Sequence, residues 1–181
     1  MSDALIAASI GAVVTVCGWF ATYLYAKRME DRRRRLEAHL LYRSQQIEQL
    51  YGPLLSLIEQ VFNVWQVREK ILESCECSTE QQRAIRELVW KRYFTPLHSE
   101  IAALLRTKLY LLDGSNLPES FASYLKHALQ EECLKLLWAE LQFDATCVPG
   151  LPWPQEFYSE VKGTLLRLME ERKQGLARLH S

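Results

Sequence analysis

The chain has 181 residues, 49% of them hydrophobic and 24% charged, which is the composition of a globular protein and excludes a disordered one. Only seven glycines and six prolines are present, which disfavours a turn-rich β fold. Basic and acidic residues balance at 22 each, and the basic charge is not spread as in a nucleic-acid binder. We therefore expect an all-α protein without a nucleic-acid partner.

The first predicted element is an uncharged segment of 23 residues, Ala4 to Ala26. As a helix it would be ~34 Å long, enough to cross a bilayer core of ~30 Å. A buried core helix and a cleaved signal peptide are the alternatives. A signal peptide carries its positive charge before the apolar run, whereas here the first basic residue is Lys27. We expect residues 1–26 to form a single-pass transmembrane anchor.

A basic block follows at residues 27–35, with six positive and two negative charges and a net charge of +4. Cytoplasmic flanks carry an excess of basic residues, so we expect the N-terminus outside and the remaining chain in the cytoplasm. The block is also expected to contact anionic lipid headgroups. Its basic residues are Lys27, Arg28, Arg32, Arg33, Arg34 and Arg35.

Small residues recur along one stripe of the predicted anchor, in steps of four and three. Small side chains let helix backbones approach one another in a bilayer, so the stripe predicts self-association. Chance is the alternative, because such residues are common in membrane helices. The stripe consists of Ala4, Ala8, Gly11, Thr15, Gly18 and Thr22.

A stalk helix is predicted at residues 27–50, where apolar residues from Leu36 onward continue at the 3.5-residue period of a coiled coil. Only Arg43 interrupts the series, and Gly52-Pro53 is expected to kink the helix or begin a new one. The seam suits an oligomer; alternatively, Leu50 to Val64 folds back into the bundle. The seam residues are Leu36, Leu40, Ile47, Leu50, Leu54, Leu57, Val61 and Val64.

Residues 51–181 are predicted to form a cytoplasmic bundle of about four helices. Thr79 and Gln82 have the spacing of a capping box, which predicts a helix start at Glu80. The predicted helices cover 80–94, 96–112, 118–143 and 154–179, separated by polar or proline-containing turns.

The sequence contains no common nucleotide-binding glycine motif, no nucleophile elbow and no Glu-x-x-His pair. Cys75-x-Cys77 is too closely spaced for a usual zinc site, and the five cysteines are interpreted as reduced thiols. We therefore assign no catalytic residue, metal or cofactor.

His127 lies beside an apolar face of its predicted helix, with Glu131 one turn away. Such a histidine is usually bonded to a backbone carbonyl; the alternative is a catalytic base, for which no adjacent nucleophile can be named. The apolar loop around Trp153 either packs over the end of the bundle or contacts a partner.

Four segments occur in order: LYGPLLSLIE (50–59), WKRYFTPLHSEI (90–101), LPESFASYLKHAL (117–129) and PGLPWPQEF (149–157). With Trp65 and Trp138, this set resembles a group of small bacterial membrane proteins that have an N-terminal anchor and a helical cytoplasmic part. The resemblance covers roughly Leu50 to Leu176 and implies a bacterial inner-membrane location without an established activity. It draws attention to a structural or binding cluster of Tyr51, Pro53, Trp65, Pro96, His98, His127 and Trp138.

These observations predict a membrane-tethered helical interaction or scaffold protein with an unidentified protein partner, of the kind found in stress or antiphage systems. The rival is a small-ligand sensor or enzyme with a pocket around His127 and Tyr51. A buried pocket with convergent polar groups and a strongly shifted histidine pKa would favour the rival. A filled bundle with an exposed apolar patch would favour the interaction protein.

Overall fold

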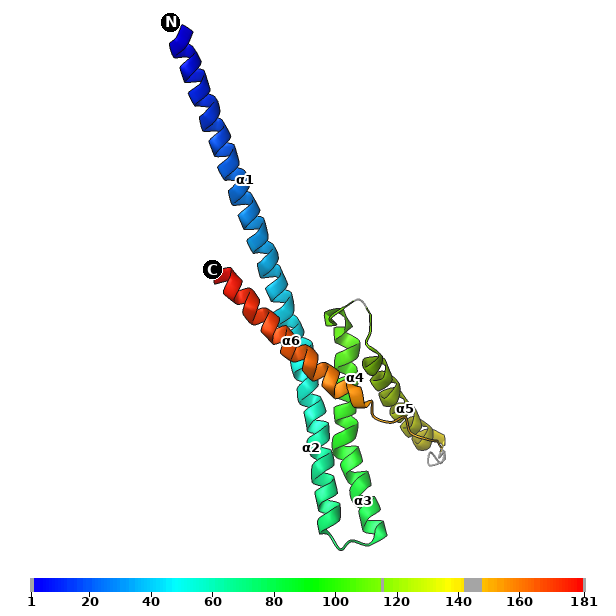
Figure 1. Cartoon of the computed structure of the whole chain (residues 1–181). Coiled ribbons are helices and arrows are strands. Elements are labelled where there is room, and N and C mark those ends of the chain that lie inside the picture. The colour runs from blue at the N-terminus through cyan, green and yellow to red at the C-terminus, as the bar shows by residue number, and fades with distance from the viewer. Residues whose placement is uncertain (1, 115, 142–147, 181) are drawn as a thin grey trace. The chain divides into compact units, whose positions relative to one another are not determined.

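The computed structural model describes residues 2–114, 116–141 and 148–180, and the side chains of 15–114, 116–137, 139–141 and 148–179. These residues form helices and contain no strand, which confirms the all-α prediction (Figure 1). The α-helices are α1 (Ser2–Gln46), α2 (Gly52–Ser74), α3 (Thr79–Val89), α4 (Thr95–Lys108), α5 (Glu119–Leu141) and α6 (Gln155–His180).

The predicted anchor lies in the first part of α1. Across the part of the chain that the structure describes, no helix combines the length and the apolar character that a membrane crossing needs. The side chains of residues 1–14, which include Ala4, Ala8 and Gly11 of the small-residue stripe, lie outside that part. Thr15, Gly18 and Thr22 of the stripe lie within it and are exposed.

The chain divides into two compact units. Unit 1 comprises residues 1–42 and 172–181, and unit 2 comprises residues 43–171. Residues 43–50, predicted as part of the stalk, thus belong to the unit that holds the bundle, and Leu50 is fully buried there.

Helix α3 begins one residue earlier than predicted. Ser78, not Thr79, is the N-cap: its hydroxyl accepts a hydrogen bond from the Gln81 amide, while Gln81 Oε1 accepts one from the Ser78 amide. Both windows have the Ser/Thr-x-x-Gln spacing, so the pattern alone does not choose between them. Gln82 instead donates to the Cys77 carbonyl at 3.4 Å and fastens the preceding loop.

Two prolines sit inside continuous helical stretches, where the sequence predicted a kink or a new start. A π-helical turn precedes each: Ile47–Tyr51 before Pro53, and Trp90–Phe94 before Pro96. A proline cannot donate to a helix and its ring clashes with the carbonyl four residues back. A wider turn relieves that clash without ending the helix.

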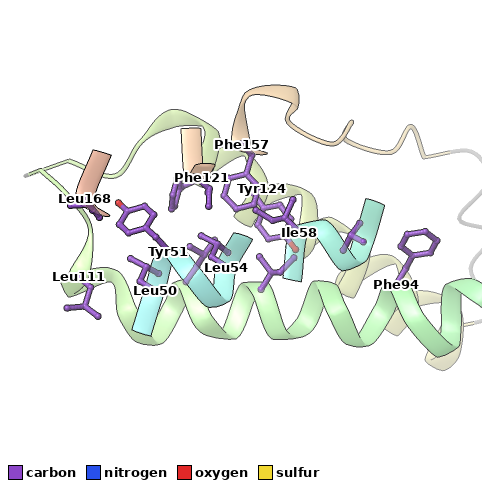
Figure 2. Packing of buried hydrophobic residues seen from close by; sticks show 14 residues of the cluster. Leu50, Tyr51, Leu54, Ile58, Phe94, Leu111, Phe121, Tyr124, Phe157 and Leu168 are labelled. Carbon is purple, nitrogen blue, oxygen red and sulfur yellow. The ribbon is translucent and has the colours of Figure 1, made fainter. Parts of the chain in front are cut away.

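The core of unit 2 lies where α2, α4, α5 and α6 meet (Figure 2). Leu50, Leu54 and Ile58 are fully buried along one face, and Phe121 and Phe157 meet edge to face with ring centroids 5.1 Å apart. Helix α2 also packs against α3, and α4 against α5. The stretch from Leu50 to Val61 therefore lies inside the bundle, the alternative that the sequence left open.

Arg43, the one charge in the apolar seam, is held in a network of ion pairs. Its guanidinium contacts Asp113 at 2.7 Å and Glu171 at 3.1 Å, and Arg167 pairs with the same two carboxylates. Burial raises the pKa of Asp113, but hydrogen bonds from Arg43 and Arg167 outweigh this and lower the pKa below its usual value. The apolar seam can accommodate the positive charge of Arg43 because Asp113 and Glu171 of the same chain neutralise it.

In unit 1, the beginning of the seam packs against α6. Leu40 is buried, and a Cβ placed on Gly175 would lie only 2.5 Å from its Cδ2. Glycine therefore allows a close approach of the two helices at this point. This part of the seam is occupied by the chain's own C-terminal helix.

We expect Gly52→Ala to destabilise the protein. A Cβ at this position would lie 2.7 Å from the backbone oxygen of Ile47, so the π-helical turn must shift, at a cost of about 1–3 kcal/mol. The free energy of unfolding is measured by urea titration of the full chain in mild detergent, with circular dichroism as the signal. Gly163→Ala is the matched control, because its Cβ would meet nothing within 4 Å and should stabilise α6 by up to about 1 kcal/mol. Equal effects of the two substitutions would contradict the close approach at Gly52.

Candidate functional site: an aromatic–histidine cluster beside an open groove

A cluster of rings joins α4, α5 and the segment that leads into α6. The ring of His98 lies parallel to that of Tyr124, with centroids 6.0 Å apart, and edge-on to Trp153 at 5.6 Å. Tyr124 stacks in turn on Phe157 at 4.6 Å, and His127 lies 5.3 Å from His98. Figure 2 shows Tyr124 and Phe157 side by side in the core. The cluster fills this end of the bundle with its own side chains.

His98 is buried, with 8% of its surface exposed. Its Nδ1 lies 3.4 Å from the Tyr124 hydroxyl, so the edge of the imidazole that carries Nδ1 points into the cluster. Burial, together with the positive charges of His127 and Lys135, lowers the pKa of His98 to about 4. The imidazole is therefore neutral at physiological pH.

His127 holds the loop that precedes α6. Its Nδ1 lies 2.6 Å from the Leu151 carbonyl oxygen, which makes the ring a donor at that nitrogen. Gln130, on the next turn of α5, accepts from the Leu151 amide at 2.6 Å and donates to the Pro149 carbonyl at 3.0 Å. His127 is thus hydrogen-bonded to a backbone carbonyl, which is the structural alternative that the sequence offered. The loop also places Trp153 against His98 and Tyr124, so Trp153 packs within the bundle.

An open groove of about 410 Å³ runs between α4 and α5. Helix α4 contributes Thr95, His98, Ser99, Ala102 and Arg106, and α5 contributes Leu125, Ala128, Leu129, Glu131, Glu132, Lys135 and Leu136. Both sets recur at steps of three and four, the spacing of one helix face. The first and last lining residues of each helix are 11 positions apart, which corresponds to roughly 16 Å of helix. The groove is thus about three turns long.

Polar groups stand at one end of the groove. Lys135 donates to the Thr95 hydroxyl at 2.8 Å, and its ammonium lies over the Trp90 ring at 5.7 Å. Burial lowers the pKa of Lys135, an effect that the nearby Glu131 and Glu132 oppose. Burial likewise raises the pKa of Glu131. These groups sit at the rim, while Ala102, Leu125, Ala128 and Leu129 supply the apolar wall.

The predicted cluster is only partly brought together. His98 and His127 are neighbours, whereas Tyr51 lies elsewhere in the core, where its hydroxyl accepts from the Asp113 amide at 3.2 Å. Trp65 is half exposed on α2, and the side chain of Trp138 lies outside the described residues. Pro53 and Pro96 follow the two π-helical turns. The groove lies beside His98, and neither Tyr51 nor His127 lines it.

The sequence did not reveal Lys135, Thr95 or the groove itself, because they depend on which helices pair. The i, i+4 spacing of Glu131 and Lys135 is the one local signal that was available. Within the residues described, no three histidine, cysteine or acidic side chains gather closely enough to hold a metal ion.

Comparison of the chain with models of protein families, with curated proteins and with solved structures gave no match.

We expect His98 to make stability depend on pH. Because its pKa is about 4 in the folded state and ~6.5 in the unfolded chain, the unfolded state binds more protons between these values. Stability should be complete above pH ~6.5 and fall by up to about 3 kcal/mol as the pH drops toward 4. His98→Phe should flatten this slope in urea titrations of the full chain in detergent.

His39→Gln, which removes a histidine from an exposed position of unit 1, is the matched control variant. Carboxylates such as Asp113 add their own slope, so the test is the difference between variants. If the wild type and His98→Phe have the same slope, His98 is not the group that titrates.

Proposed function

We propose that the chain is a membrane-tethered helical interaction protein and that the α4–α5 groove is where an amphipathic helix of its protein partner docks. The observation that carries the proposal is the three-turn apolar groove, which the rest of the described chain leaves open. Laying an apolar helix face into such a groove is a common mode of protein recognition.

The shape of the groove favours a helix over an extended peptide. Its two walls are single faces of neighbouring helices, and a third helix buries apolar residues between them by the packing that forms helical bundles. Burying the remaining exposed surface of Leu129 and Leu136, two leucines that line the groove, would contribute about 1–2 kcal/mol each. Leu129 is 60% exposed and Leu136 is 54% exposed.

The polar groups of the groove suit a rim. Lys135, Glu131 and Glu132 stand near one end and Arg106 near the other, so charges flank the apolar wall as they do at protein interfaces. His98 is engaged with Tyr124, and its depressed pKa is accounted for by burial in the ring cluster. The histidine therefore acts as part of the supporting wall.

The membrane tether is supported by the sequence. The uncharged segment Ala4 to Ala26 and the basic block at 27–35 are those of a single-pass anchor with its N-terminus outside. The resemblance to small bacterial membrane proteins suits an inner-membrane location. Self-association is proposed to run through the small-residue stripe of the anchor, because Leu40 and Leu50 of the stalk seam are buried within the chain.

A small apolar ligand is the second candidate for the groove. Its volume of about 410 Å³ falls in the ~300–1,000 Å³ range of small-molecule sites. A sensor of this kind would retain a small molecule through gentle purification, and mass spectrometry of a solvent extract would identify it.

The groove predicts a partner contact that Leu129→Glu should weaken. A photo-crosslinking amino acid at position 136 of the full chain in native membranes should give a discrete protein adduct. Leu129→Glu should reduce that adduct at least tenfold, because a charge would have to be buried in the apolar wall. Gel electrophoresis and mass spectrometry of the adduct measure this and tell another protein from a second copy of the chain.

Leu166→Glu is the matched control. Leu166 is 58% exposed on α6 and does not line the groove, so its substitution should leave the adduct intact. A wild-type protein without an adduct at position 136, or equal losses in both variants, would contradict docking in the groove.

The proposed tether predicts that Cys75 and Cys77 lie on the cytoplasmic side of the membrane. An impermeant thiol reagent applied to intact spheroplasts should leave both unlabelled until lysis, since the basic flank keeps the C-terminal part in the cytoplasm. Both thiols are free, and Cys75 is exposed and accessible to the reagent after lysis. Labelling before lysis would reverse the topology, and recovery of the chain in the soluble fraction would refute the tether.

A further inference from the structure

A second pocket, of about 450 Å³, lies within unit 1, between α1 and the end of α6. Helix α1 lines it with Met29, Arg32, Arg33 and Leu36, and α6 lines it with Arg178 and Leu179. It thus joins the basic block to residues far later in the chain, Arg178 and Leu179. The sequence pattern alone gave no sign of this contact.

The close approach at Gly175 explains why α6 reaches the basic block. Because Leu40 contacts this glycine, the positions three and four residues further along α6 share its face. These positions are Arg178 and Leu179, and Leu36 lies one turn before Leu40 on the facing side of α1. The helix packing therefore brings Leu36 and Leu179 close together, and exposed side chains of α1 and α6 complete the pocket.

The charges in the pocket favour an anion. Three guanidinium groups and one carboxylate, that of Glu30, line it, so the lining side chains carry a net charge of +2. Glu30 is paired with Arg34 on the next turn of α1, and Arg33 is paired with Glu37 at 2.9 Å. A guanidinium group has five N–H donors, so an anion would be bound by the donors that such a pair leaves over. Guanidinium groups bind phosphate oxygens in a fixed fork geometry.

The apolar members of the pocket indicate what accompanies the anion. Met29, Leu36 and Leu179 stand beside the three arginines, so the pocket combines phosphate-binding and hydrocarbon-binding surfaces. Met29 follows Ala26, the end of the uncharged segment, by three residues, or ~4.5 Å of helix. That distance corresponds to the headgroup layer of a membrane that the segment would enter.

We infer that this pocket binds the headgroup of an anionic phospholipid, with the Arg178 guanidinium from α6 as a phosphate contact beside Arg32 and Arg33. The inference rests on the proposed tether and adds to it a defined lipid site made by two helices. The glycerol and first methylene groups of the lipid lie against Met29 and Leu179. The C-terminal helix is thereby a part of the membrane attachment.

The test is native mass spectrometry of the full chain, purified in mild detergent and supplied with phosphatidylglycerol or phosphatidylcholine. The wild type should retain phosphatidylglycerol in preference to phosphatidylcholine. Arg178→Gln should weaken that retention roughly tenfold, because a charge-assisted hydrogen bond contributes about one factor of ten in affinity. Lys173→Gln, which removes the same charge from an exposed position of α6 outside the pocket, should have a much smaller effect.

Three results would overturn the inference: retention by Arg178→Gln equal to the wild type, equal losses in Arg178→Gln and Lys173→Gln, or displacement of the lipid by an equal concentration of inorganic phosphate. The second would mean diffuse charge attraction, and the third a site for free phosphate. Circular dichroism checks that both variants remain folded. Membrane fractionation of the same cells tests the tether separately, since a soluble chain whose lipid retention depends on Arg178 would refute the tether and retain the lipid site.

Discussion

The missing N–H of proline is the constraint around which unit 2 is arranged. Pro53 and Pro96 each follow a π-helical turn by two residues, and each helix continues through them. The last residue of each turn, Tyr51 and Phe94, places an aromatic ring in the core. A wide turn re-aims the residues that follow it, because it inserts one extra residue into the helical repeat. The prolines thereby determine which faces of α2 and α4 are buried.

Polar contacts hold the other end of the same core. The Gln46 side chain donates to the Leu111 carbonyl at 2.9 Å, and the Tyr51 hydroxyl accepts from the Asp113 amide. Asp113 also receives both Arg43 and Arg167. The turn after α4 is therefore fixed by α1, α6 and the first π-helical turn together. Because α4 is held at both ends, its groove face is presented in one fixed position beside α5, which is what a docking surface requires.

The all-α class could be predicted from the sequence, because apolar residues recur at helical spacing over long stretches that contain few glycines and prolines. The details depended on contacts between distant residues. The period-3.5 seam predicted Leu54, Leu57 and Val61 on one face, whereas the structure buries Leu54, Ile58 and Val61. Arg43 looked like an interruption because its partners, Asp113 and Glu171, are 70 or more positions away. The helix start at Thr79 was missed by one residue because two overlapping windows share the same capping pattern.

The candidate site was predictable to a smaller degree. His127 could be interpreted from its own helix, because a histidine beside an apolar face commonly bonds to a carbonyl, and it bonds to Leu151. His98 and Lys135 could not, because their surroundings come from the packing of α4 against α5. No local pattern states which two helices will be neighbours. A groove is a property of such a pair and is visible only once the pair is known.

The contribution of α6 to the core has a consequence for the order of synthesis. Phe157, Val161 and Leu168 are fully buried against residues from the first half of unit 2, and Glu171 completes the pairing of Arg43. A chain still on the ribosome lacks these side chains until nearly all of unit 2 has been made, at about 5–20 residues per second. The apolar faces of α2 and α5 stay uncovered for that interval, so nascent chains are exposed to chaperones and to one another before α6 emerges.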